Sequence, residues 1–151
     1  MNSPEKAEQK FISGYNCAQS VFSVMAAEIG FNEQVAIDIS RAFGAGISYR
    51  AEMCGAVSGG LMAIGLRIGN ITGDETLKKE LTLKYATEFI TNFKALNSSV
   101  ICKEILGKDL SIPAEREALN TEGTFDKICP KIVKSSAEIL AEIFREIETS
   151  K

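Results

Sequence analysis

The four cysteines are the residues of this sequence whose chemistry is most specific. Cys17, Cys54, Cys102 and Cys129 are widely spaced along 151 residues, and no two of them form a C-x-x-C pair. The spacing therefore gives neither a thioredoxin-type motif nor paired zinc knuckles. We expect a cytoplasmic protein, and in that compartment four cysteines favour redox chemistry or metal binding over permanent disulfides.

Histidine is absent from the chain, and its absence excludes several classes of site. Catalysis by a Ser-His-Asp triad or a Cys-His pair requires an imidazole base. Zinc motifs built on histidine and covalent haem attachment through C-x-x-C-H require the same side chain. Any chemistry of the cysteines must therefore proceed without histidine.

The four cysteines share a predicted position at the start of a helix. Cys17 follows Asn16, a predicted N-cap, and Cys54 opens a glycine-rich helix. Cys102 lies in the first turn of a short helix, and Cys129 directly precedes a proline of the kind that favours the first helical position. The sequence thus predicts four thiols near helix N-termini.

A helix N-terminus favours a thiolate over a thiol, because its free N–H groups and dipole stabilise negative charge. Thiol pKa values then fall below their usual value of about 8.5, and the thiolate is the reactive form. Arg50, four residues before Cys54, would add positive charge, and Gly55 would let a partner sulfur or a substrate approach. The alternative is that the thiols are inert, since free cysteines are among the most buried residues.

Helical periodicity runs through nearly the whole chain and predicts an all-α fold. We expect a single domain over residues 1–151, a bundle of about six to seven helices. The expected helices cover residues 4–12, 16–30, 32–42, 53–68, 72–96, 98–107 and 130–147. The polar segment 108–125 is predicted to be the most mobile connection, with at most one further turn of helix at Pro113.

The helix that follows Cys54 contains four glycines: Gly55, Gly59, Gly60 and Gly65. Each glycine costs about 1 kcal/mol of helix propensity relative to alanine, so a close contact must offset the loss. Gly55 and Gly59 lie on one face of the helix. We expect this face to meet another helix, or the thiol cluster, at short backbone distance.

Charge and hydropathy exclude two classes of partner. The net charge is −3 and no cluster of Lys and Arg stands out, so a nucleic-acid partner is not expected. The longest uncharged stretch, residues 11–27, is interrupted by polar side chains and is too short to span a membrane. The first residues alternate in charge and lack the pattern of a signal peptide.

The cysteine motifs resemble those of a known family. The matching segments are Gly14-Tyr15-Asn16-Cys17-Ala18-Gln19, Phe43-Gly44-Ala45-Gly46, Cys54-Gly55-Ala56-Val57-Ser58-Gly59, Cys102-Lys103-Glu104-Ile105-Leu106-Gly107 and Cys129. In this order they resemble the redox-active protein family with the C…GCAxxG…C…C signature, here in its CGAxxG form. Ser48-Tyr49 replaces a more glycine-rich run of that family. The resemblance implies a helical fold and a redox role.

We therefore expect thiol–disulfide redox work, as in a thiol-disulfide oxidoreductase, with a partner protein or a small-molecule oxidant and no cofactor. Cys17 with Cys54 is the preferred pair, and Cys102 with Cys129 the complementary one. The first alternative is an iron–sulfur cluster or zinc bound by Cys17, Cys54, Cys102 and Cys129. The second is a non-catalytic helical interaction domain with buried thiols. A homodimer is compatible with each of these functions.

Overall fold

The computed structural model describes residues 1–150, which form nine α-helices and one 3₁₀ helix with no β-strand. The helices are α1 (Ser3–Ile12), α2 (Cys17–Glu28), α3 (Glu33–Ile39), η1 (Arg41–Phe43), α4 (Gly44–Ile47), α5 (Gly55–Gly69), α6 (Glu75–Asn97), α7 (Cys102–Leu106), α8 (Pro113–Glu122) and α9 (Thr124–Thr149). The all-α prediction is confirmed, and the count exceeds the expected six to seven because α4 and α8 were not predicted as helices.

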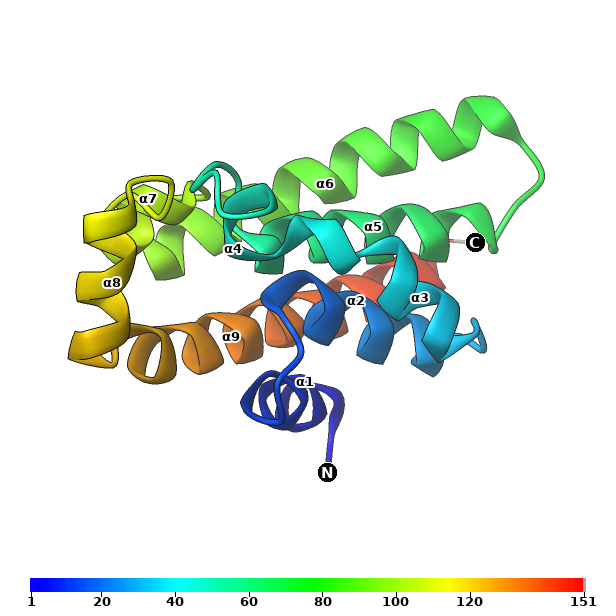
Figure 1. The fold of residues 1–151 in the computed structure, drawn as a ribbon. Helices are drawn as coiled ribbons and strands as arrows, with labels where there is room; N and C mark the ends of the chain where they lie inside the picture. Colours follow the sequence, from blue (N-terminus) through cyan, green and yellow to red (C-terminus); the bar gives the residue numbers. More distant parts are fainter. Residues whose placement is uncertain (151) are drawn as a thin grey trace.

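The core lies between α2, α5, α6 and α9, and α1 crosses below them against α9 (Figure 1). The long helix α9 buries the apolar stripe that its sequence predicts. Helix α6 packs against α9 and buries large aromatic side chains. Fully buried members of this core are Met25, Ile64, Tyr85, Phe89, Phe93, Leu140, Ile143 and Ile147. One end of the bundle, where α7 and α8 link α6 to α9, carries a second, smaller core around Cys102 and Cys129.

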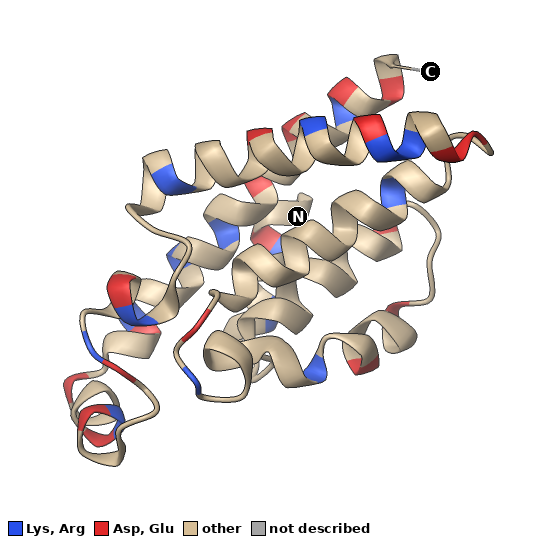
Figure 2. Cartoon of the chain, turned by 90° about the horizontal axis from the view of Figure 1, so that it is seen from above, with Lys and Arg blue, Asp and Glu red and all other residues tan. Residues whose placement is uncertain are grey.

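Charged residues of both signs are spread over the outer helices, whereas α2 and α5 carry one each, Glu28 and Arg67 (Figure 2). This distribution follows from the central position of α2 and α5, because a charge buried there would lose its hydration. Within residues 1–150, no helix combines the length and the apolar character needed to cross a bilayer.

The segment after Leu106 is more regular than the sequence predicts. Pro113 takes the first position of the ten-residue helix α8, and Gly123, with a φ of 70°, ends it. Leu119 is fully buried, so α8 packs one apolar face although most of its residues are polar. The segment therefore holds a longer helix than the single further turn that we expected at Pro113.

The start of α9 also differs from the prediction. The chain turns at Gly123 and α9 begins at Thr124, so Pro130 lies inside the helix. Cys129 is consequently the sixth residue of α9 and not at its N-terminus. Proline inside a helix removes a hydrogen bond, but Pro130 is buried in a helix whose apolar stripe continues on both sides of it. Tertiary packing thus outweighs the local helix-start signal.

The glycine face of α5 meets α2 at short range, as expected. A Cβ atom at Gly59 would lie 2.6 Å from the carbonyl oxygen of Ala18. A Cβ atom at Gly55 would lie 2.9 Å from the Ala18 nitrogen and 3.0 Å from the Cys17 Cβ. The distances of 2.6 Å and 2.9 Å to the Ala18 backbone are shorter than real Cβ contacts, so only glycine permits this approach. The contact sets the N-terminal turn of α2, with Cys17, directly against the first turn of α5.

Candidate thiol site

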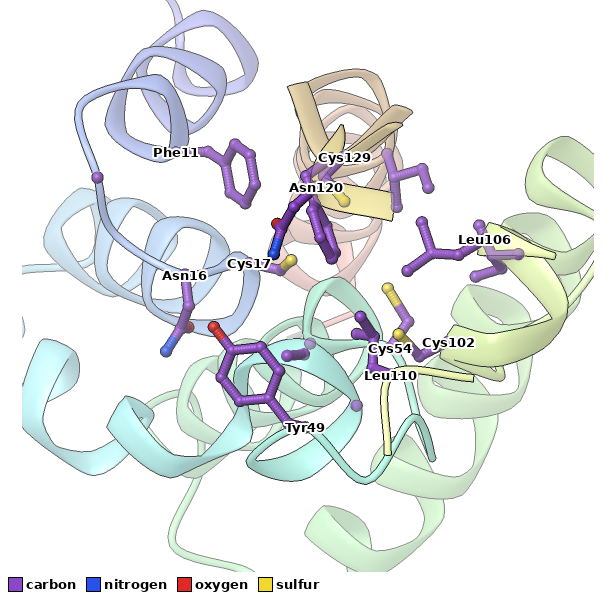
Figure 3. Close-up of a pocket in the computed structure, with 17 residues that line it drawn as sticks. Phe11, Asn16, Cys17, Tyr49, Cys54, Cys102, Leu106, Leu110, Asn120 and Cys129 are labelled. Atoms are coloured by element: carbon purple, nitrogen blue, oxygen red, sulfur yellow. The ribbon is translucent and has the colours of Figure 1, made fainter. Parts of the chain in front are cut away.

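One pocket, with a volume of about 260 Å³, brings the four cysteines together at the α7–α8 end of the bundle (Figure 3). Cys17 comes from α2, Cys54 from the residue before α5, Cys102 from α7 and Cys129 from α9. The other lining residues are Phe11, Gly14, Asn16, Ala45, Gly46, Tyr49, Gly55, Ile105, Leu106, Leu110, Asn120, Phe125 and Ile132. None of these residues carries a charge. The pocket is therefore an apolar chamber whose only ionisable groups are thiols and one phenol.

Cys17 is held by a predicted capping box. The Asn16 side chain accepts a hydrogen bond from the Gln19 N–H at 2.9 Å, and the Gln19 side chain accepts one from the Asn16 N–H at 3.1 Å. Asn16 Nδ2 also donates to the Arg41 carbonyl at 2.9 Å. A Cβ atom at Gly44 would collide with the Asn16 side chain, so glycine is required there. The cap fixes Cys17 as the first helical residue, and Cys17 is the least buried of the four thiols.

Cys54 and Cys102 are brought together by a short antiparallel pairing of backbone. Met53 and Ile101 form an isolated β-bridge, flanked by a bond from the Cys54 N–H to the Val100 carbonyl at 2.8 Å. The Cys102 N–H donates to the Glu52 carbonyl at 2.6 Å. Residues on either side of a bridged pair project to the same face. The two thiols accordingly lie side by side on the wall of the pocket, as Figure 3 shows.

Cys17 and Cys129 form the second pair. The Cys129 thiol, across the contact between α2 and α9, is the group that raises the pKa of Cys17 most. Figure 3 shows both thiols among the side chains that line the pocket. Cys129 lies in the interior of α9 and not at the helix start that the sequence predicts. The pairing of Cys17 with Cys54 stays a prediction, since the Cys17 thiol also acts on the pKa of Cys54.

A family model described as "putative redox-active protein (C_GCAxxG_C_C)" matches residues 15–143, a span that includes all four cysteines. The chain belongs to this family. No curated protein and no solved structure matches the chain. Membership confirms the resemblance drawn from the cysteine motifs, and the matched span contains the four cysteines that line the pocket.

The segment before Cys54 has an unusual backbone in this C_GCAxxG_C_C protein. Ala45, Ile47, Ser48, Tyr49 and Ala51 all have positive φ angles, between 51° and 69°. L-residues rarely adopt this left-handed conformation in succession, since each costs about 1–2 kcal/mol. In the sequence, this segment differed from the family pattern because Ser48-Tyr49 stands where the family has a more glycine-rich run. The left-handed turn carries Ala45 and Tyr49 to the pocket wall.

Burial dominates the acidity of the thiols. Burial, and after it the nearby Cys17 thiol, together raise the pKa of Cys54 to about 12. The N–H groups of Ala56 and Val57 in the first turn of α5 act in the opposite direction, but less strongly. Burial likewise raises the pKa of Cys102 to about 12. The lowered pKa expected from helix N-termini is therefore wrong for these thiols, because removal from water outweighs the helix end.

The pKa of Cys17 is also raised, first by its hydrogen bond with the Cys129 thiol and then by burial. Two backbone N–H groups, its own and that of Ala45, lower this pKa. The left-handed turn thus supplies a donor for the Cys17 sulfur. The neutral thiol is the resting form, and an anionic sulfur formed during reaction would find two backbone donors.

Two supporting residues predicted from the sequence have different outcomes. Gly55 lines the pocket and admits the Cys17 side chain, as expected. Arg50 is exposed and is not among the groups that affect the pKa of Cys54, so the predicted positive charge is not supplied. Sequence reasoning missed Phe11, Asn120 and Phe125, because only the packing of α1, α8 and α9 brings them to the cysteines.

For the alternative of zinc or an iron–sulfur cluster, the chain has suitable ligands, but they are not arranged around a common centre. Four thiolates can bind zinc or an iron–sulfur cluster when their sulfur atoms point to a common centre. In the described part of the chain, no three Cys, Asp or Glu side chains are arranged to hold a metal ion. The cysteines are arranged as two pairs, Cys17 with Cys129 and Cys54 beside Cys102. Metal binding would require these side chains to turn toward one point.

Proposed function

We propose that this protein is a thiol-based redox protein in which Cys17 and Cys129 cycle between a dithiol and a disulfide. The observation that carries the proposal is that both thiols line one pocket, at the contact between α2 and α9, helices far apart in the sequence. The Cys129 thiol is also the group that raises the pKa of Cys17 most, as expected for neighbouring thiols, and a disulfide would bring the two sulfur atoms to about 2.05 Å. When the disulfide forms, the two S–H bonds break, and two electrons and two protons pass to an oxidant.

Cys17 is the thiol that we assign to the first step. It is the most accessible of the four, and the N–H groups that favour its anion come from its own helix and from Ala45. Cys129, which is buried, then completes the disulfide. Cys54 and Cys102 form a second dithiol behind the first, and they would exchange electrons with an outside oxidant through Cys17.

Disulfide mapping tests this assignment. The fully reduced protein is treated with diamide, the remaining thiols are alkylated, and the peptides are identified by mass spectrometry. We expect Cys17–Cys129 as the first disulfide, in the wild type and in the Cys54→Ser control. In Cys54→Ser/Cys102→Ser/Cys129→Ser, a mixed disulfide of Cys17 with an added small disulfide should accumulate, because no second thiol remains to resolve it.

Two results would contradict the proposal. Four unreacted thiols after diamide treatment would favour the interaction domain with inert cysteines. Stoichiometric zinc or iron in protein purified without oxygen, with loss of the metal in the cysteine variants, would favour the metal alternative. A first disulfide between Cys17 and Cys54 would restore the pairing preferred from the sequence and overturn the assignment of Cys129.

A further inference from the structure

The composition of the pocket restricts the oxidant that can reach the cysteines. Its lining contains no Lys, Arg, Asp or Glu among the described residues. Arg116, the nearest cation to the lining on α8, stacks on the Tyr49 ring at 4.4 Å and donates to the Leu110 carbonyl at 3.0 Å, so it does not line the pocket. A carboxylate or phosphate entering this chamber would lose its hydration without gaining a counterion.

The size and shape of the pocket restrict the oxidant further. At about 260 Å³ the chamber is slightly smaller than the usual range of ligand pockets, about 300–1,000 Å³. Cys54, Cys102 and Cys129 are each only 6–7% exposed. A folded partner protein could contact Cys17 alone, whereas a small flat molecule could enter the chamber and reach the pair.

The walls offer aromatic surface and an uncommitted hydrogen-bond donor. Phe11, Tyr49 and Phe125 line the chamber from three different segments of the chain. Aromatic rings favour flat, apolar ligands. Asn120 on α8 also lines the pocket, and its side chain is among those drawn there in Figure 3. Its amide can donate to a carbonyl oxygen of a bound molecule.

We propose that the oxidant of the Cys17–Cys129 dithiol is a small, uncharged quinone bound in this chamber, an inference that rests on the proposed dithiol function. The two S–H bonds break and an S–S bond forms. The two electrons and two protons pass to the quinone, whose two carbonyl groups become the hydroxyl groups of a hydroquinone. Asn120 donates to the carbonyl oxygen on which negative charge develops during the transfer.

The test compares three oxidants on the full-length reduced protein without oxygen: duroquinone, oxidised glutathione and diamide. Duroquinone is fully substituted, so it is not consumed by simple addition of a thiol to an open ring position. Each rate is divided by the rate of the same oxidant with dithiothreitol. Quinone absorbance and the number of alkylatable cysteines are followed together.

We expect one hydroquinone per Cys17–Cys129 disulfide. The normalised rate with duroquinone should exceed that with oxidised glutathione at least about tenfold, because the carboxylates of glutathione find no counterion in the chamber. The Cys17→Ser/Cys129→Ser double variant should not consume duroquinone. In Asn120→Ala, the ratio of the quinone rate to the diamide rate should fall about fivefold, the effect of one hydrogen bond. The matched control Asn92→Ala, on α6 and outside this pocket, should keep the wild-type ratio.

The outcomes separate the two proposals. If diamide forms the Cys17–Cys129 disulfide but duroquinone gives no advantage over oxidised glutathione, the quinone inference is wrong and the dithiol function stands. If diamide forms no such disulfide, both fail. Equal behaviour of Asn120→Ala and Asn92→Ala would remove Asn120 from the quinone site, and consumption of duroquinone by the double variant would overturn the reaction itself.

Discussion

Two opposing effects act on the Cys17 and Cys54 thiols of this site, and their balance decides the acidity of each thiol. Helix-start N–H groups stabilise the thiolate, whereas burial in an apolar pocket destabilises it. For Cys54 and Cys102 burial is the larger effect and the pKa rises to about 12. The reduced state is therefore a set of neutral thiols packed as small apolar groups, and reaction depends on access through Cys17.

The raised pKa values predict a fall in stability at high pH. Below about pH 8.5 the thiols are neutral in both the folded and the unfolded chain. Between that pH and about 12, Cys54 and Cys102 ionise only in the unfolded chain. Because this ionisation stabilises the unfolded state, each thiol lowers the free energy of unfolding as the pH rises. The slope should reach about 1 kcal/mol per pH unit for each thiol.

Urea unfolding of the reduced protein from pH 7 to 11 measures this effect. Cys54→Ala should make the decline shallower, because one titrating group is lost. A decline of the same slope in the wild type and the variant would contradict the assignment.

In alkylation experiments, Cys17 should react first and the other three slowly until the protein unfolds.

At the scale of the elements, the α2–α5 contact depends on glycine at particular positions. Gly59→Ala should destabilise the protein by about 1–3 kcal/mol, because the new Cβ would lie 2.6 Å from the Ala18 carbonyl oxygen. Gly65 is a matched control in the same helix, with no heavy atom within 4 Å of its Cβ position. Gly65→Ala should stabilise by about 1 kcal/mol through helix propensity. Chemical denaturation should show that the free energy of unfolding falls in Gly59→Ala and rises in Gly65→Ala. A change of the same sign in both variants would disprove the close approach.

The left-handed turn before Cys54 stores conformational strain. Ile47 is a β-branched residue with a φ of 69°, and glycine adopts this conformation without a steric cost. Ile47→Gly should therefore leave stability unchanged or raise it by up to about 1 kcal/mol. Leu83 is 72% exposed on α6, and Leu83→Gly should lower the free energy of unfolding by about 1 kcal/mol. A comparable loss in both variants would show that the turn is not strained at Ile47.

At the scale of the whole molecule, the thiol pair couples the redox state to global stability. A Cys17–Cys129 disulfide would join α2 to α9 and enclose most of the chain. A cross-link over about 100 residues restricts the unfolded state strongly, and native disulfides contribute about 2–4 kcal/mol. The oxidised protein should therefore unfold at a higher denaturant concentration than the reduced one, and Cys129→Ser should abolish the difference. Equal midpoints for the two wild-type forms would argue against this cross-link.

The sequence by itself determined the all-α fold, the capping box of Asn16, the glycine face of α5 and the cysteine signature of the family. The helices, the capping box and the glycine face depend on neighbours within one or two helical turns, so the local pattern contains them, and the cysteine signature is given by residue types and their order in the chain. Other features depended on packing between distant segments. The left-handed turn, the start of α9 at Thr124 and the approach of Cys129 to Cys17 were decided by the tertiary structure. The same packing set the thiol acidity, because burial is a property of the folded whole and the helix start is a property of a single element.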